Sequence, residues 1–175
     1  MLAMQLPVQS LHLVFTLPHE FNPLILASQA LIIGIFFSAI HKILNRVFKR
    51  DFGCQPGMAM VLHTWGQRMN LHVHCHVLVF AGGPSLDGST WIDIPTDVQH
   101  PMDPKRLSRC FRKQFVRSLR KAFSNHLLTM PDAMRRVDRL EAFDAWLAPV
   151  VKKPGRSIPK NLLRTAKMLG PRSSI

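Results

Sequence analysis

The stretch NLHVHCHVLVFAGG, residues 70–83, places three histidines at alternate positions in an otherwise apolar run. Successive side chains of a β-strand point to opposite faces, so His72, His74 and His76 would share one face while aliphatic residues fill the other. Residues two positions apart lie about 6.5 Å apart along a strand, which lets two imidazole nitrogens converge on one ion at about 2 Å each. The pattern predicts a strand with a metal-binding face. The alternative is that the histidines are structural, hydrogen-bonded residues.

The charge of the chain is strongly uneven. Lys and Arg number 23 against ten Asp and Glu, which gives a net charge of +13 over 175 residues. Residues 1–100 contain five basic and five acidic side chains, so the whole excess lies in residues 101–175. A chain of this length suits one domain with a sizeable core. The asymmetry favours a polyanionic partner, with nucleic acid ahead of a membrane surface.

Residues 23–40, PLILASQALIIGIFFSAI, are apolar enough to be considered as a membrane span. However, Ser28, Gln29 and Ser38 interrupt the run, and a helical apolar stripe continues beyond it. We therefore predict one long buried helix over residues 23–50, with no membrane partner.

The three cysteines are widely separated and form no CxxC pair, so neither a zinc ribbon nor a disulfide framework is indicated. This cysteine usage suits a reducing compartment, and we expect the protein to be cytoplasmic.

The remaining elements follow from periodicity and turn residues. Strands are predicted at 10–18, 58–65 and 71–81, an edge strand at 90–95, and helices at 104–127 and 136–147. The five residues between the second and third strands are a hairpin length. Asp103 and Pro104 suit the N-cap and first turn of the helix that follows them.

The predicted helix over 104–127 has one strongly basic face. Its basic side chains recur at spacings of three and four and form a ridge about 20 Å long. We call this set the basic ridge: Arg106, Arg109, Lys113, Arg117 and Arg120. Because no acidic residue interleaves with them along the helix, phosphate binding is favoured over a merely solvated face.

Three phrases in this order resemble one known family: LHLVFTLPHEFNPL, LHTWGQRMNLHVHCHVLVFAGG and SRCFRKQFVRSL. They are similar to the core of rolling-circle insertion-sequence transposases, the two-tyrosine branch of the HUH nuclease superfamily. The likeness covers about residues 7–125. It implies an α+β fold in which helices flank an antiparallel sheet, the ferredoxin-like HUH nuclease core. We assign that core to residues 1–149 and expect residues 150–175 to form an irregular basic tail.

The resemblance also implies a site. HUH denotes two histidines around a hydrophobic residue, and both His72-Val73-His74 and His74-Cys75-His76 satisfy it. Aligned with the family's phrase, His74 and His76 take the metal-binding positions and His72 is an additional upstream histidine. His63 is the candidate third ligand, because the hairpin places its strand beside the histidine strand. The family uses Mg²⁺ or Mn²⁺ on single-stranded DNA at insertion-sequence ends, whereas imidazole ligands alone would have favoured zinc.

The chain departs from the family in one decisive respect, because it contains no tyrosine. In the family a tyrosine hydroxyl attacks the DNA and becomes covalently linked to its 5′ end. No paired cysteines precede Leu11, so the family's N-terminal zinc module is also missing. We therefore expect a truncated copy, frameshifted near Val150, that binds DNA and a divalent metal and has no catalytic nucleophile of its own. The alternative is a non-enzymatic basic nucleic-acid-binding protein.

Overall fold

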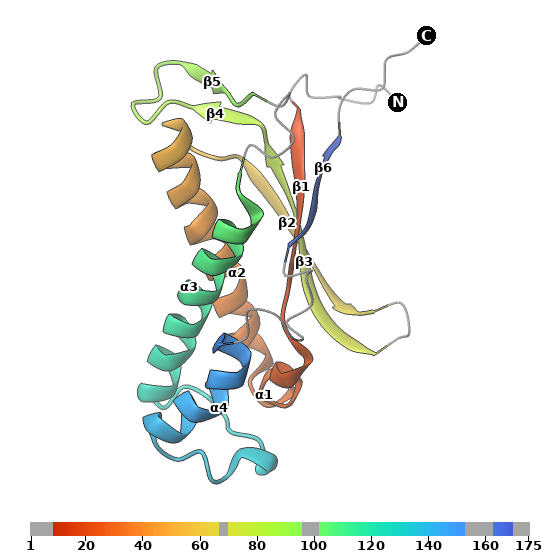
Figure 1. The fold of residues 1–175 in the computed structure, drawn as a ribbon, viewed down its shortest axis with the longest axis vertical. Coiled ribbons are helices and arrows are strands. Elements are labelled where there is room, and N and C mark those ends of the chain that lie inside the picture. The colour runs from red at the N-terminus through yellow and green to blue at the C-terminus, as the bar shows by residue number, and fades with distance from the viewer. Residues whose placement is uncertain (1–8, 67–69, 96–101, 153–162, 170–175) are drawn as a thin grey trace.

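The computed structural model describes residues 9–66, 70–95, 102–152 and 163–169, and its helices stand on one side of a β-sheet (Figure 1). The elements in chain order are β1 (Ser10–Thr16), η1 (His19–Phe21), α1 (Asn22–Ala27), α2 (Gln29–Val47), the π-helical turn η2 (Phe48–Phe52), β2 (Met58–Trp65), β3 (Leu71–Phe80), β4 (Gly82–Pro84), β5 (Trp91–Asp93), α3 (Pro104–Ser124), η3 (Asp132–Met134), α4 (Leu140–Lys152) and β6 (Leu163–Leu169).

The main sheet has four antiparallel strands in the order β2-β3-β1-β6. Its four strands and the two long helices follow one another along the chain in the order β1, α2, β2, β3, α3, β6. In the sheet the last strand, β6, lies beside the first, β1. This is the ferredoxin-like, split βαβ arrangement. The predicted α+β class, with an antiparallel sheet and flanking helices, is therefore confirmed.

The fourth strand lies in the segment for which the sequence predicted only an irregular tail. β6 pairs antiparallel with β1, and the register shifts between His12 and Val14. α4 also continues through residue 149 to Lys152. The local sequence of β6 mixes basic and apolar residues and has little strand character of its own. The hydrogen bonds that β1 offers along its second edge supply the preference that local sequence lacks.

The predicted single helix over residues 23–50 is divided at Ser28. This residue has φ −135° and ψ 47°, outside the helical region, and it separates α1 from α2. Its hydroxyl donates to the carbonyl oxygen of Thr129 at 3.1 Å and accepts from the Thr129 amide at 2.7 Å. The break therefore ties the start of α2 to the segment that follows α3. After η2, Gly53 adopts φ 70°, which ends the helical segment.

α3 begins as predicted, because the Asp103 side chain accepts a hydrogen bond of 2.9 Å from the Lys105 amide. It ends at Ser124, three residues earlier than predicted, where His126 takes a positive φ of 55°. The predicted helix at 136–147 is α4, displaced to Leu140–Lys152, because η3 and the turn after it occupy the preceding residues.

The predicted edge strand at 90–95 is β5, which pairs with β4 in a separate two-stranded sheet. Gly83 in β4 packs directly against the backbone of Gln55, and a side chain at this position would collide with the Gln55 carbonyl oxygen. The second glycine of the Gly82-Gly83 pair is thus required by a close backbone approach.

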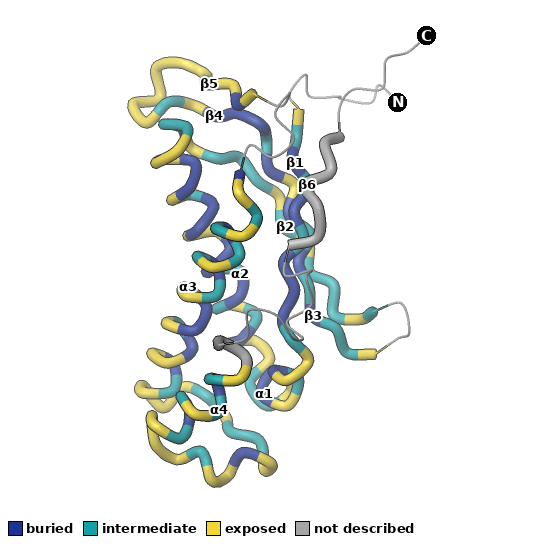
Figure 2. The backbone as a smooth tube through the Cα atoms, viewed as in Figure 1, coloured by how far each residue is buried: buried dark blue, intermediate teal, exposed yellow. Residues whose placement is uncertain are grey.

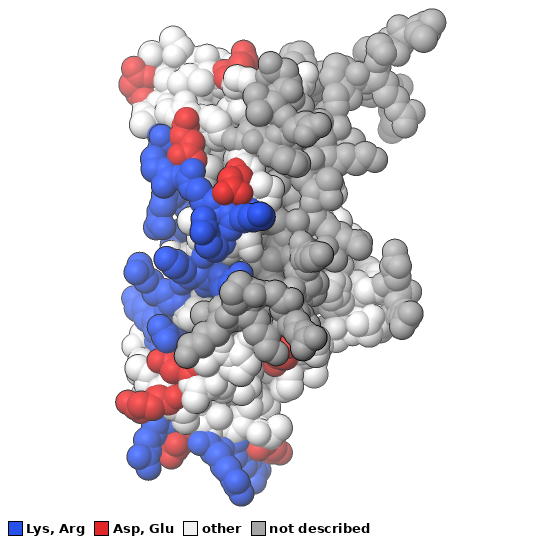
Figure 3. Space-filling view, in the orientation of Figure 1, with Lys and Arg blue, Asp and Glu red and all other residues white. Residues whose placement is uncertain are grey.

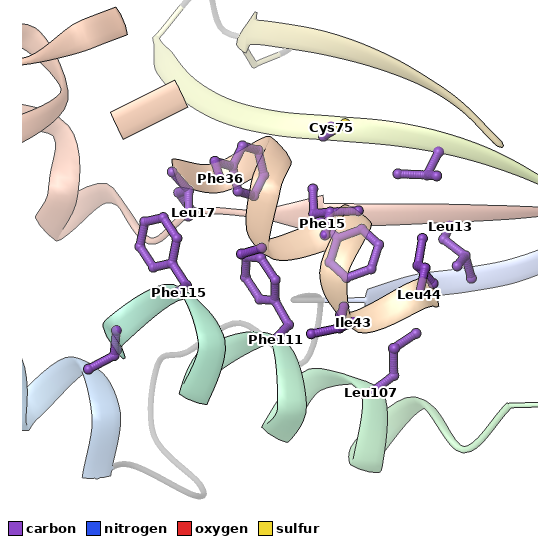
Figure 4. Packing of buried hydrophobic residues seen from close by; sticks show 14 of the residues in the cluster. Leu13, Phe15, Leu17, Phe36, Ile43, Leu44, Cys75, Leu107, Phe111 and Phe115 are labelled. Atoms are coloured by element: carbon purple, nitrogen blue, oxygen red, sulfur yellow. The ribbon is translucent and has the colours of Figure 1, made fainter. Parts of the chain in front are cut away.

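One core fills the space between the helices and one face of the sheet (Figures 2 and 4). Phe111 of α3 contacts Phe15 of β1 and Phe36 of α2, with ring centroids 5.2 and 5.8 Å apart. Phe115, one turn later, also packs on Phe36. The helical stretch Gln29–Phe52 is long and apolar enough to cross a membrane, and 44% of an apolar 18-residue window within it is buried in the fold. Its apolar side thus contributes to this core.

Candidate metal centre

The histidines lie on the face of the sheet opposite to this core. Val73, Cys75, Val77 and Val79 of β3 are buried toward the helices, so the alternate residues of the strand point the other way. In the β2–β3 hairpin His63 is directly opposite His74. Residues directly opposite each other project to the same face, so the hairpin adds His63 to the histidines of β3.

Three of the four predicted ligands converge. One ring nitrogen from each of His63, His74 and His76 lies within 4.8 Å of the others, and we call these residues the histidine trio. The ring centroid of His63 is 5.1 Å from that of His74 and 4.6 Å from that of His76. Three nitrogens bound to one ion at about 2.1 Å are about 3 to 4 Å apart. Small ring rotations would therefore bring all three onto a single ion.

The hydrogen bonds of the trio leave suitable nitrogens for an ion. Nδ1 of His74 donates to the carbonyl oxygen of His72 at 2.8 Å, so its Nε2 has a free lone pair. Nδ1 of His76 lies 2.8 Å from Nε2 of His12. If Nε2 of His76 were to hold an ion, Nδ1 would carry the hydrogen and would donate it to Nε2 of His12. Partners of this kind fix the tautomer and the ring orientation of a ligand histidine.

His72, the fourth predicted ligand, is outside the trio. Its ring centroid is 5.1 Å from that of His74, and its carbonyl oxygen accepts the hydrogen bond described above. Of the two possible HUH registers, the one that the structure brings together with His63 is His74-Cys75-His76. The ligand roles of all four residues remain predictions.

His12 is a site residue that the sequence did not reveal. It occupies an outward-facing position of β1, between the buried Leu11 and Leu13. The alternation of apolar and polar residues at the start of SLHLVFT was sufficient to predict that the His12 side chain points away from the core. The missing information was that β1 is the neighbour of β3, which places the His12 ring 5.0 Å from that of His76 and within 12° of parallel.

The electrostatics of the site favour a neutral imidazole at His76. Burial, followed by the nearby His63, His12 and His74, lowers the pKa of His76 below its usual value of 6.5. Burial and then the neighbouring His74 lower the pKa of His72 in the same way. Neutral imidazole is the metal-binding form. Because the trio has no carboxylate, a bound divalent ion would keep its full positive charge and attract an anion such as phosphate.

The basic ridge lies on the side of α3 opposite to its buried residues, and Figure 3 shows basic side chains gathered over the helices. The structure shows acidic partners at its two ends. Arg106 pairs with Asp51 at 3.0 Å, and Arg120 pairs with Asp144 at 2.6 Å. The three central members are exposed, and Lys113 and Arg117 line a surface hollow of about 340 Å³ beside the helix. Among the residues that the structure describes, acidic partners are found only for the two end members, so the unpaired charge of the ridge is concentrated in its middle: Arg109, Lys113 and Arg117.

The ridge and the trio are on opposite sides of the molecule. The apolar side of α3 packs on β1 through Phe111 and Phe15, whereas the trio projects from the far face of the same sheet. At least one helix diameter, about 10 Å, and the sheet itself separate them. One phosphate cannot contact both, so any nucleic acid bound at the ridge would do so through a different segment.

Two curated proteins that are similar to this chain are both described as transposases. A curated relative from Sinorhizobium fredii, "Putative transposase y4qJ", is 36% identical over 149 residues, which is 84% of this chain and 37% of the relative. The transposase for insertion sequence element IS801 of Pseudomonas savastanoi pv. phaseolicola is 39% identical over 77 residues, 44% of this chain and 18% of the relative. The chain thus spans well under half the length of either protein.

Solved structures of the conjugative relaxase TrwC with oriT DNA are similar at 16% sequence identity. The metal-free complex has a TM-score of 0.46 and covers 64% of this chain and 44% of the relaxase chain. A second, metal-bound complex has a TM-score of 0.46 and covers 65% and 43%. The profile of the Y2_Tnp family, described as "Putative transposase", matches residues 57–154. This match includes the hairpin with the histidine trio, and the chain belongs to the Y2_Tnp transposase family.

Proposed function

We propose that this chain is the DNA-binding core of an insertion-sequence transposase, which holds one divalent metal ion on the histidine trio and binds single-stranded DNA. The observation that carries the proposal is the convergence of His63, His74 and His76 on the face of the sheet away from the helices. Three imidazoles with spare nitrogens at one point are a metal-binding arrangement, and membership of a transposase family makes DNA the natural anion for that ion.

The donor set fits a divalent transition metal better than Mg²⁺. Imidazole nitrogen binds Mn²⁺, Zn²⁺ and similar ions, whereas Mg²⁺ prefers oxygen ligands and keeps several waters. Of the two ions that the resemblance implies, we therefore infer Mn²⁺ as the better occupant. When bound, such an ion supplies Lewis-acid polarisation of a phosphate oxygen. His63, His74 and His76 would hold it, and the hydrogen bonds to His72 and His12 would orient the rings of His74 and His76.

The basic ridge supplies a second, electrostatic contribution to DNA binding. Arg109, Lys113 and Arg117 are exposed, and a row of such groups neutralises successive phosphates. Because the ridge lies on the opposite side from the trio, we infer that it contacts a part of the DNA away from the metal-bound phosphate. Binding at the ridge alone corresponds to the alternative of a non-enzymatic nucleic-acid-binding protein, and would persist without metal.

The chain supplies no phenolic nucleophile, since it has no tyrosine. We infer that it binds and positions DNA without forming the tyrosyl–DNA ester implied by the resemblance. A nucleophile also has to be held in line with the phosphorus, and loss of such positioning alone raises a barrier by several kcal/mol.

Titration calorimetry with Mn²⁺ tests the proposal. Wild-type protein should bind one ion, and His63→Ala, His74→Ala and His76→Ala should each abolish measurable binding. His41→Ala is the matched control, because His41 is an exposed histidine on α2 outside the trio. Unchanged Mn²⁺ binding in any of the three trio variants would contradict the ligand assignment, and metal-independent DNA binding without an ion site would support the alternative.

A further inference from the structure

Trp65, the last residue of β2, has a largely exposed ring that contacts the histidine trio. It is 56% exposed, and its ring stacks on that of His63, with centroids 5.9 Å apart and planes within 3° of parallel. The other tryptophans have different surroundings. Trp146 packs on Phe21 and Phe143, and the ring nitrogen of Trp91 donates to Asp93 at 2.8 Å. Trp65 therefore combines a large exposed ring with direct contact to a member of the histidine trio.

Trp65 lies at the edge of the main sheet, next to the trio. β2 is an edge strand of the sheet, so no strand in the described part of the chain covers its outer side. On the other side of His63 along β2, Val61 is 55% exposed and directly opposite His76. The trio is thus flanked along one strand by apolar surface, and one flank is a flat aromatic ring. A nucleotide has the matching composition, with an anionic phosphate joined through one sugar to a flat, stackable base.

We propose that Trp65 is a stacking platform for a base of single-stranded DNA, next to the phosphate that the histidine trio holds through its metal. This inference rests on the proposed function, in which the histidine trio holds a phosphate through its metal. It adds that Trp65 recognises a neighbouring base. Bases stack on exposed aromatic rings without much sequence preference, because every base has a π-face. In a duplex both faces of each base are already stacked, so a platform of this kind favours single strands.

The charge around Trp65 favours single-stranded DNA over an apolar peptide as the ligand that stacks on its ring. The chain has a net charge of +13, and the trio next to Trp65 would carry an uncompensated divalent ion. Both features attract a polyanion and give an uncharged peptide no advantage. Single-stranded nucleic-acid sites characteristically combine aromatic platforms with positive charge.

The test compares matched tryptophan variants of the full chain in binding a labelled oligothymidylate at one fixed salt concentration. Trp65→Leu should raise the Kd by about 10-fold, the order expected for loss of one stacked base. Trp65→Phe keeps an aromatic face and should retain most of the affinity. Trp91→Leu is the control, because Trp91 is similarly exposed, at 49%, but lies in β5 outside the main sheet.

Two further measurements distinguish a loss of base stacking in Trp65→Leu from misfolding and from a loss of metal binding. An abasic oligonucleotide of the same length should bind wild-type protein and Trp65→Leu equally, because it has no base to stack. Mn²⁺ affinity, measured by calorimetry, should be the same in both proteins. Trp65→Leu protein that binds Mn²⁺ normally and oligothymidylate as tightly as wild type would overturn the proposal, as would an equal loss in Trp91→Leu. A loss specific to Trp65→Leu in protein that binds no Mn²⁺ would support stacking and contradict the metal site.

Discussion

Nε2 of His12 in β1 lies 2.8 Å from Nδ1 of His76 in β3, although 64 positions separate them in the sequence. The contact exists because β1 is the strand next to β3, and both histidines project from the face away from the core. It orients one member of the histidine trio from outside the trio. In the proposed metal site, a histidine would thus perform the supporting role that carboxylates and carbonyl groups commonly perform for ligand imidazoles.

Replacing His12 should therefore weaken metal binding without abolishing it. His12→Leu removes the partner of His76 Nδ1, and loss of such a partner typically costs 10- to 100-fold in metal affinity, so we expect the Kd for Mn²⁺ to rise by roughly that factor. Calorimetry at constant pH provides the measurement, with His41→Leu as the control for an exposed histidine on α2. A His12→Leu protein with wild-type Mn²⁺ affinity would show that the hydrogen bond does not support the site.

Acid should destabilise the metal-free protein through His76. Its pKa is lowered in the folded state, by burial and then by the neighbouring histidines, from the usual value of 6.5. The unfolded chain therefore takes up the proton more readily, and the free energy of unfolding falls as the pH drops below about 6.5 through the folded-state pKa. With a chelator present, the thermal midpoint should be lower at pH 5 than at pH 7.5, and His76→Gln should reduce this difference.

His41→Gln is the matched control for the acid effect, because it removes an exposed histidine that is not part of the cluster. It should keep the full wild-type loss of stability between the two pH values. If His76→Gln also keeps the full loss, the acid sensitivity arises elsewhere in the chain.

The sequence alone predicted which residues of β3 face the core and which face away from it. It did not predict that β1 is the neighbour of β3 or that β6 pairs with β1. The alternation in residues 71–81 is a local property, and a five-residue connection sufficed to place His63 beside His74. The partner of β1 is a tertiary property, so neither the role of His12 nor the pairing of β6 could be derived from periodicity. The break at Ser28 likewise depends on its hydrogen bonds with Thr129, which is 101 positions away.

The basic ridge should control the salt dependence of DNA binding. Replacing Arg109, Lys113 and Arg117 together with Gln should weaken binding to single-stranded DNA and flatten the plot of log K against log salt by roughly 0.7 for each phosphate that the variant no longer neutralises. The control carries the same change of charge on exposed arginines outside the ridge: Arg135, Arg136 and Arg139. Equal flattening in both triple variants would indicate a general charge effect and no ridge site.

No covalent protein–DNA product should form, because the chain has no tyrosine to attack the phosphorus. Purified protein incubated with end-labelled single-stranded DNA and Mn²⁺ should leave the label unshifted on a denaturing gel, with at most slow hydrolysis. A shifted band that resists denaturant, and that His74→Ala abolishes, would show that another side chain of this protein acts as the nucleophile.

The central claim, that three histidines on the face of the sheet away from the helices hold one divalent ion, is tested most directly by anomalous diffraction from crystals grown with Mn²⁺. The account predicts a single manganese peak about 2 Å from one nitrogen each of His63, His74 and His76, with His72 outside the coordination sphere. A peak coordinated by His72 and His74 without His63, or the absence of any peak at the trio in crystals containing excess Mn²⁺, would contradict it.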